Sequence, residues 1–226
     1  MLTEPPGEGA PAVRRITDAP TRLLHWLLAL SFSGAYLTGD SDGWRQLHIT
    51  LGYSVACLLA WRLVYGLIGP KQARLSLWWR KLSALPGWLS SLSRQPDSWG
   101  PAARQGQHLV TALSTGLILM LVIPLTLSGH ATYEEWGAAR GDEWMQELHE
   151  LVGNIFLTVV LLHIGMIALL SLLQRRNLAK PMLSGRIDGQ GPSPVRYNRM
   201  WLAALMLALW LGLVAWLWHI HPQPSL

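Results

Sequence analysis

The feature that most constrains this chain is a set of long apolar stretches without a polar face. They cover residues 21–38, 47–68, 108–127, 148–173 and 200–220. A helix needs about 20 apolar residues to cross the roughly 30 Å hydrocarbon core of a bilayer, and most of these stretches reach or approach that length. A soluble domain of this size cannot bury five such helices. The sequence therefore predicts an integral membrane protein.

We expect an all-α fold, in which a four-helix transmembrane bundle is followed by a fifth, C-terminal transmembrane helix. Residues 1–20, which contain several prolines and glycines, predict a cytoplasmic tail, and residues 21–186 predict the transmembrane domain. Residues 187–226 predict a linker and the fifth helix. The Trp-rich segment at about 75–93 is interrupted by charges and a proline, which favours an interfacial segment over a further span. No cleavable signal peptide is expected.

The basic residues indicate how the helices are oriented in the membrane. Of the 18 Lys and Arg residues, 15 lie before or at the very start of the first stretch or in the second and fourth connections. The first and third connections carry an acidic group: Asp40, Asp42, Glu134, Glu135, Asp142, Glu143 and Glu147. The positive-inside rule then places the N-terminus in the cytoplasm and the C-terminus outside. The pI of about 9.8 follows from this topology and from anionic lipid, so no nucleic-acid partner is predicted.

Two histidines lie inside the longest apolar stretch, 148–173. His149 and His163 are 14 residues apart, which brings them within about 40° of the same helix face and roughly 21 Å apart along the axis. One imidazole therefore lies near each side of the bilayer. Ionisable side chains in lipid usually face a bundle interior and have a partner there. We therefore expect each histidine to have a partner at the same depth.

Two further histidines lie at the depths that this argument requires. His48 opens a helix that runs inward, so it lies near the outer surface with His149. His25 lies about 7 Å inside the cytoplasmic edge, level with His163. Gly52 and Gly153 each follow an outer histidine by four residues and leave a patch without side chains on the same helix face. The sequence predicts two histidine pairs, one near each side of the membrane.

Several chemistries fit membrane histidines, and the pattern separates them. Imidazole nitrogen is a good axial ligand for haem iron, and facing helices of a bundle can hold a porphyrin. Zinc requires four ligands at one point, and a proton relay requires mid-depth carboxylates, which the stretches lack. Hydrogen-bonded packing is the remaining alternative for any one histidine. Cys57 is the only cysteine, which excludes a disulfide framework, a CxxCH haem attachment and a cysteine-ligated iron–sulfur cluster.

Particular segments also resemble a known family. ELHELVGNIFLTVVLLHIGMIALLSLLQRRNLAKPMLSGR is similar to the fourth helix and following loop of the bacterial cytochrome b561 / nickel-iron hydrogenase b-type cytochrome family. TRLLHWLLAL resembles its first helix, and LHITLGY and WRLVYGLIGP resemble its second. The resemblance runs from about residue 16 to 186. All four histidine ligands of the family pattern have counterparts here, with the 14-residue spacing on the fourth helix.

The resemblance implies a di-haem membrane cytochrome of the bacterial inner membrane that holds two haem b groups. Carried over by position, His48 and His149 would ligate the periplasmic haem, and His25 and His163 the cytoplasmic haem. The family passes electrons between the quinone/quinol pool and a periplasmic partner, such as a c-type cytochrome, a hydrogenase or another oxidoreductase subunit. The acidic outer side could dock such a partner.

Three other residues are assigned with alternatives. The family often has Gly-His-Asn-Pro where this chain has Gly106-Gln-His108-Leu. His108 is therefore either a residue near a haem or a rival of His25 for the inner iron. Arg22 and Arg62 lie near the inner pair, where they could neutralise haem propionates or extend to the cytoplasmic interface.

Two other functions stay open on the sequence alone. Similar superoxide-oxidising cytochromes suggest a stand-alone quinone-linked oxidoreductase, which would turn over without a partner protein. A haem-free membrane scaffold is the second alternative, and it predicts that loss of His149 or His163 leaves a colourless, functional protein.

Overall fold

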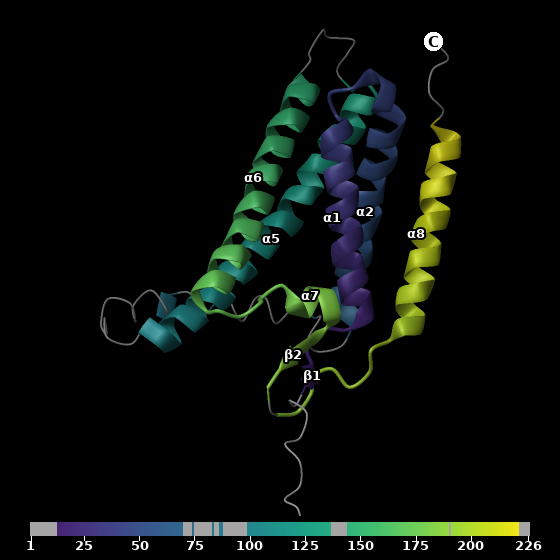
Figure 1. The fold of residues 1–226 in the computed structure, drawn as a ribbon. Helices are drawn as coiled ribbons and strands as arrows, with labels where there is room; N and C mark the ends of the chain where they lie inside the picture. The colour runs from purple at the N-terminus through teal and green to yellow at the C-terminus, as the bar shows by residue number, and fades with distance from the viewer. Residues whose placement is uncertain are drawn as a thin grey trace, which may run out of the picture.

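The computed structural model describes residues 13–69, 74, 83, 86–87, 99–136, 144–189 and 191–221, with the backbone alone for 99–108 and 110. This part of the chain is mostly helical (Figure 1). Its elements in chain order are β1 (Val13–Arg15), α1 (Ala19–Thr38), the 3-10 helix η1 (Asp42–Trp44), α2 (Arg45–Ile68), α5 (Trp99–Tyr133), α6 (Trp144–Leu173), α7 (Lys180–Ser184), β2 (Arg186–Asp188) and α8 (Met200–Ile220).

Four of the described helical segments are long and apolar enough to cross a membrane. They are Asp42–Ile68, Thr111–Tyr133, Trp144–Leu173 and Met200–Ile220. The first expected span, α1, is not among them. Its 20 residues include Arg22, His25 and several serines and threonines, so no 18-residue stretch within it is as apolar as those in the four qualifying segments. The C-terminal helix α8 does qualify.

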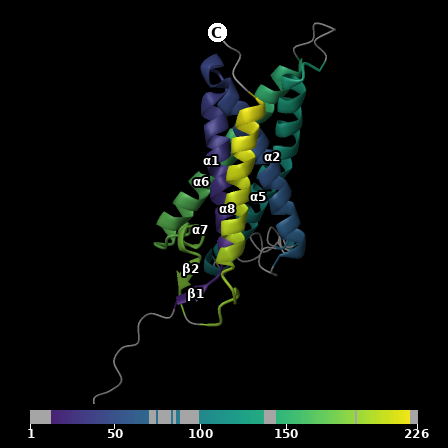
Figure 2. The same cartoon turned by 90° about the vertical axis from the view of Figure 1, so that its right-hand side faces the viewer.

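The helices form two antiparallel hairpins that face one another. α1 packs against α2, α5 packs against α6, and α2 contacts α5. α8 lies on the opposite flank of the first hairpin, against both α1 and α2 (Figures 1 and 2). The hydroxyl of Tyr36 in α1 donates to the side-chain oxygen of Asn154 in α6 at 3.0 Å, which joins the two hairpins near the C-terminal end of α1.

Two apolar cores hold this arrangement together. The first lies among α1, α2, α5 and α6 and is built from Phe32, Val55, Leu59, Val122, Leu125, Val152 and Phe156. The second lies among α1, α2 and α8 and is built from Leu24, Leu27, Leu58, Tyr65 and Met206. Phe32 and Phe156 meet with ring centroids 4.4 Å apart. Phe156 is seven residues from both His149 and His163, and Phe32 is seven residues from His25, so the first core lies about midway between the predicted pairs.

A buried carboxylate connects three helices at the end of the molecule where α1 begins. Asp18 caps α1 by accepting hydrogen bonds from the backbone nitrogen and the hydroxyl of Thr21 at 3.2 and 2.6 Å. The same carboxylate accepts from the hydroxyl of Tyr65 in α2 and pairs with Arg199 at the start of α8 at 3.4 Å. Its side chain is 2% exposed. Asp18 therefore ties three helices together.

The structure differs from the sequence-based expectations in two segments. Within the expected tail 1–20, residues 13–15 form β1, which pairs antiparallel with β2 in the segment expected to be a linker. α5 begins at Trp99, upstream of the expected start at His108. Pairing between segments so far apart in sequence leaves no local pattern, which is why the sheet was missed. The expected interfacial segment 75–93 lies almost entirely outside the described residues.

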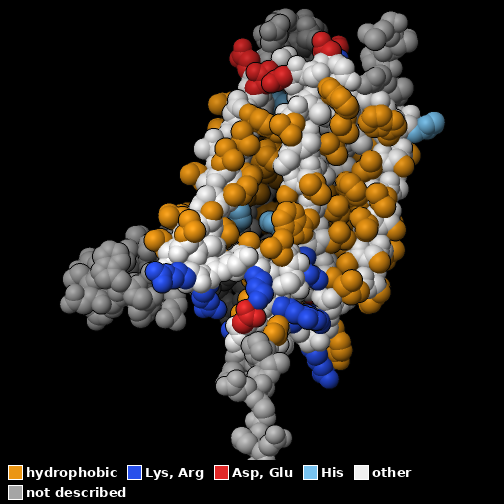
Figure 3. Space-filling model, viewed as in Figure 1, with side chains coloured by type: hydrophobic (Ala, Val, Ile, Leu, Met, Phe, Trp, Pro, Cys, Tyr) orange, Lys and Arg blue, Asp and Glu red, His pale blue; other side chains and the backbone are white. Residues whose placement is uncertain are grey.

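Charged side chains separate to the two ends of the molecule. Figure 3 shows Asp and Glu side chains at one end of the apolar surface, and Lys and Arg side chains at the other end beside α7 and the sheet. The predicted charge asymmetry is therefore present in the folded chain, which has an acidic and a basic end.

Candidate functional site

The acidic ends of α2 and α6 bring two histidines together. His48 lies in the first turn of α2 and His149 lies in the second turn of α6. Their ring centroids are 6.0 Å apart and their planes are nearly perpendicular, at 89°. This is the outer pair that the sequence predicts, and the two rings belong to different hairpins.

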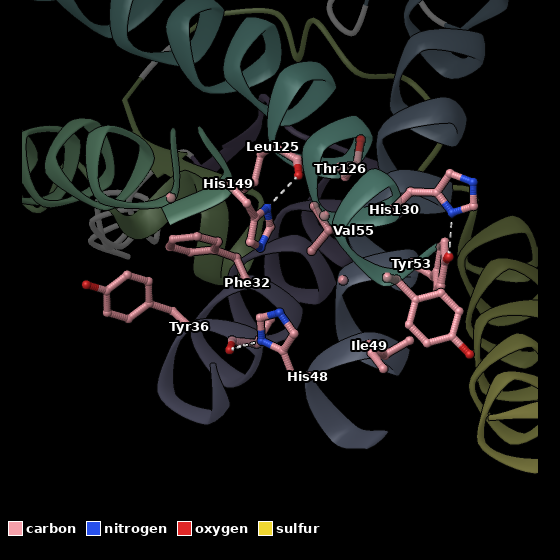
Figure 4. A pocket seen from close by; sticks show the side chains of 15 residues that line it. Phe32, Tyr36, His48, Ile49, Tyr53, Val55, Leu125, Thr126, His130 and His149 are labelled. Carbon is pink, nitrogen blue, oxygen red and sulfur yellow. Dashed lines mark hydrogen bonds between the residues drawn. The ribbon is translucent and has the colours of Figure 1, made fainter. Parts of the chain in front are cut away.

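The distance between these rings suits one metal ion held between two imidazoles. A bond from a metal ion to an imidazole nitrogen is about 2.0–2.1 Å long, and the centre of the imidazole ring lies about 1.1 Å from that nitrogen. Two rings on opposite sides of one ion therefore have centres about 6 Å apart. Figure 4 shows the nitrogens not engaged in the drawn hydrogen bonds pointing toward one another. The donor set therefore fits an axially ligated haem iron.

Backbone carbonyls orient both rings. Nδ1 of His48 donates to the carbonyl oxygen of Ala35 at 2.8 Å, and Nδ1 of His149 donates to that of Leu125 at 3.1 Å. A carbonyl only accepts, so Nδ1 carries the proton and Nε2 keeps its lone pair. Metal-ligating histidines are usually oriented in this way. The Oγ of Ser128 lies 3.2 Å from Nδ1 of His149 as well.

A cavity surrounds the pair. It encloses about 710 Å³ of empty space, including the part open to the outside. Its lining comes from α1, α2, α5 and α6: Phe32, Ala35, Tyr36, His48, Ile49, Gly52, Tyr53, Val55, Leu125, Thr126, Gly129, His130, Tyr133, His149 and Gly153. Gly52 and Gly153 both line it, and a Cβ at Gly52 would meet no atom within 4 Å.

One glycine in the lining is required because a histidine ring lies very close to its backbone. A Cβ on Gly129 would lie 2.8 Å from Cε1 and 3.2 Å from Nδ1 of His149. Real Cβ atoms do not come so close, so only glycine lets the His149 ring lie against α5.

The second predicted pair lies toward the basic end. His25 on α1 and His163 on α6 are both partly buried and are close enough for their charges to interact. Ser114 Oγ on α5 lies 3.0 Å from Nδ1 of His163. Figure 3 shows histidine side chains in a hollow of the apolar surface between α6 and α1. His25 and His163 therefore lie on facing hairpins in this half of the bundle.

The remaining predicted residues are placed differently. Arg22 donates from its guanidinium to the carbonyl of Leu183 at 3.1 Å, so its side chain is directed to the segment around α7. Arg62 interacts electrostatically with Asp18. His108 is part of α5, but its side chain lies outside the described residues. In the described part of the chain, no point brings together three or more His, Cys, Asp or Glu side chains that could hold a metal ion.

A second group of polar rings, which sequence reasoning missed, borders the cavity. The Tyr53 hydroxyl and Nδ1 of His130 are 2.7 Å apart, and the Tyr133 hydroxyl and Nδ1 of His221 are 2.9 Å apart. His221 also stacks on Tyr53, with centroids 5.6 Å apart. The third apolar stretch of the sequence ends at residue 127, before His130, but α5 continues to Tyr133. Apolar composition could not reveal this, because Ser128, Gly129 and His130 end the apolar run.

Comparisons with known proteins show which family this chain resembles. The family model described as prokaryotic cytochrome b561 matches residues 16–185. A protein of Rhizobium leguminosarum bv. viciae described as a probable Ni/Fe-hydrogenase B-type cytochrome subunit is 25% identical, over 75% of this chain and 87% of its own length. No solved structure is similar enough to count as a match.

Proposed function

The chain belongs to the prokaryotic cytochrome b561 family, and from this premise we propose that it is a di-haem b-type cytochrome. It would transfer electrons across the bacterial inner membrane between a periplasmic redox partner and the quinone pool. Membership itself implies a haem b protein of the membrane that transfers electrons. The number of haems, the ligands, the quinone and the partner are our proposal.

The observation that carries the proposal is the opposed pair of His48 and His149, 6.0 Å apart, with both Nε2 atoms directed into one cavity. We assign these two residues to the outer haem, and His25 and His163 to the inner haem. When bound, haem b held by two imidazoles supplies one-electron chemistry with both axial positions filled.

The protein's own residues perform three tasks in this proposal. The carbonyls of Ala35 and Leu125 keep Nε2 of the outer histidines unprotonated and directed into the cavity. The apolar core around Phe32 and Phe156 excludes water from the space between the two pairs. We propose Arg62 as a counter-charge near the inner pair. Arg22 is a weaker candidate, because its guanidinium is already bonded to Leu183.

The orientation and partners follow from charge. We propose five spans, with α1 crossing beside α2, so that the basic end faces the cytoplasm and the C-terminus faces the periplasm. We also keep the division into a di-haem domain at 21–186 and a fifth helix after it. The relative described as a hydrogenase subunit supports an oxidoreductase subunit as the periplasmic partner, and the acidic end is where a soluble partner would dock.

Spectroscopy of purified variants tests the proposal. Reduced-minus-oxidised spectra of the wild type should show b-type bands, with two haems per chain. His149→Ala and His163→Ala should each retain about one haem. The matched control is His219→Ala, which removes an exposed histidine at the acidic end and should retain two. A wild-type protein without haem, or an H149A variant that keeps both haems, would refute the proposal.

A further inference from the structure

Three segments meet in a pocket at the basic end of the molecule. The pocket lies between β1, β2 and the connection to α8, and its lining is Val13, Arg15, Arg186, Ser193, Val195 and Arg196. We infer that this arginine pocket binds the phosphate group of an anionic phospholipid. The inference goes beyond the proposed electron transfer and rests on it only for the side of the membrane that the pocket faces.

The register of the sheet places two positive charges directly opposite one another. β1 pairs with β2 so that Arg15 lies opposite Arg186. Like charges in such a cross-strand position destabilise a sheet, and a sheet of two three-residue strands has little stability to lose. An anion between the two guanidinium groups would reverse the sign of this interaction.

Backbone contacts bring the third arginine to the same place. The backbone nitrogen of Arg15 donates to Ser193 Oγ at 3.1 Å, and that of Val195 donates to the carbonyl of Arg15 at 3.3 Å. The side chain of Arg196 lies over the Tyr197 ring, with the guanidinium carbon 5.2 Å from its centroid. Main-chain hydrogen bonds therefore hold the segment of Arg196 beside Arg15, and the Tyr197 ring positions the Arg196 guanidinium.

The carboxylates of the neighbourhood are already paired. Asp188 pairs with Lys180, and Asp18 pairs with Arg199. The Lys180 ammonium donates to Asp188 at 2.5 Å and holds the pKa of that carboxyl below its usual value. In this part of the chain, neither carboxylate pairs with an arginine of the pocket.

The position of the pocket favours a lipid over a free anion. Guanidinium groups bind phosphate through paired hydrogen bonds. In the proposed orientation, the pocket faces the cytoplasmic leaflet, where anionic headgroups concentrate and each nearby basic residue is attracted to the surface. Met200 and Trp201 in the first turn of α8 are 61% and 70% exposed, so acyl chains could pack on apolar side chains beside the arginines.

A lipid-binding experiment on the full chain tests the inference. Wild type, an Arg15→Gln/Arg186→Gln variant and a control Arg175→Gln/Arg176→Gln variant would be delipidated and titrated with phosphatidylglycerol, phosphatidylcholine or inorganic phosphate. The control removes the same charge after α6, from residues that do not line the pocket. Native mass spectrometry would count bound lipids, and tryptophan fluorescence would follow thermal unfolding.

We expect wild type and control to bind phosphatidylglycerol and gain thermal stability, with the Kd of the R15Q/R186Q variant raised at least about tenfold. Arg196→Gln, which lies outside the strands, should weaken binding even if the double variant folds poorly. Equal weakening in the R175Q/R176Q variant would overturn the inference, and so would full stabilisation by inorganic phosphate alone. Haem spectra of the same samples report separately on the proposed function.

Discussion

At the scale of single residues, the site depends on groups that hold histidines rather than on histidines alone. The sequence predicts that His48 and His149 belong together, because both lie at the same depth along their helices. It could not predict that the carbonyls of Ala35 and Leu125 would orient them, because those contacts join different helices. Nor could it identify Gly129 as the residue that gives the His149 ring its space.

Replacing Gly129 by alanine should therefore damage the outer site specifically. The new Cβ would lie 2.8 Å from the His149 ring, so the ring must turn away from its bond with Leu125. We expect a lower content of the outer haem, or a shifted midpoint potential for it, in redox titrations. Gly212→Ala is the control, because a Cβ there meets nothing within 4 Å. Identical potentials and haem contents in the two variants would contradict this role of Gly129.

The polar rings beside the cavity give a second test at this scale. The Tyr53 hydroxyl is bonded to His130, and both side chains line the cavity. Tyr53→Phe removes one polar group and keeps the stacking on His221. We expect the midpoint potential of the outer haem to shift in a redox titration while the haem content is unchanged. Tyr197→Phe, at the opposite end of the molecule, should leave both potentials at their wild-type values.

At the scale of helices and strands, apolar length predicted the long helices well and their ends less well. α2, α6 and α8 begin within a few residues of the expected positions, because the bilayer requires apolar residues along the whole span. The start of α5, the small sheet and the contacts of Asp18 were missed. Each depends on segments distant in sequence or on polar residues outside the apolar runs.

Asp18 offers a test of how the helices are fastened together. Asp18→Ala removes the cap of α1 and leaves the Tyr65 hydroxyl and the Arg199 guanidinium without their shared acceptor. Breaking a buried charged pair in this way costs about 3 kcal/mol, which should appear in denaturant unfolding in detergent. Asp40→Asn, at an exposed position before α2, should unfold like the wild type. A D18A variant as stable as D40N would show that the cluster is dispensable.

At the scale of the whole molecule, the number of spans decides on which side each end of the chain lies. An odd number of spans places the ends on opposite sides of the membrane, and an even number places them on the same side. Among the residues that the structure describes, four helical segments qualify by length and composition, and α1 would be the fifth span. Its close packing against α2 and α8 supports a position within the bilayer.

Reporter fusions distinguish the two topologies. With five spans, alkaline phosphatase fused after residue 221 should be active in the periplasm, and green fluorescent protein fused there through the same secretion route should be dark. The same reporters placed before residue 13 should give the opposite result. If both ends report the cytoplasm, α1 does not cross the membrane and the proposed depth of His25 is wrong.

The contact between α2 and α8 also bears on how the protein is made. The Gln46 side chain donates to the carbonyl of Trp218 at 2.7 Å, across 172 residues of sequence. Ribosomes add about 5–20 residues per second, so roughly 9–35 s separate the synthesis of the two partners. During that interval the amide of Gln46 has no acceptor from α8. The α1–α2 hairpin is therefore completed only after α8 has been synthesised, and a chain interrupted before α8 keeps an unsatisfied polar group at Gln46.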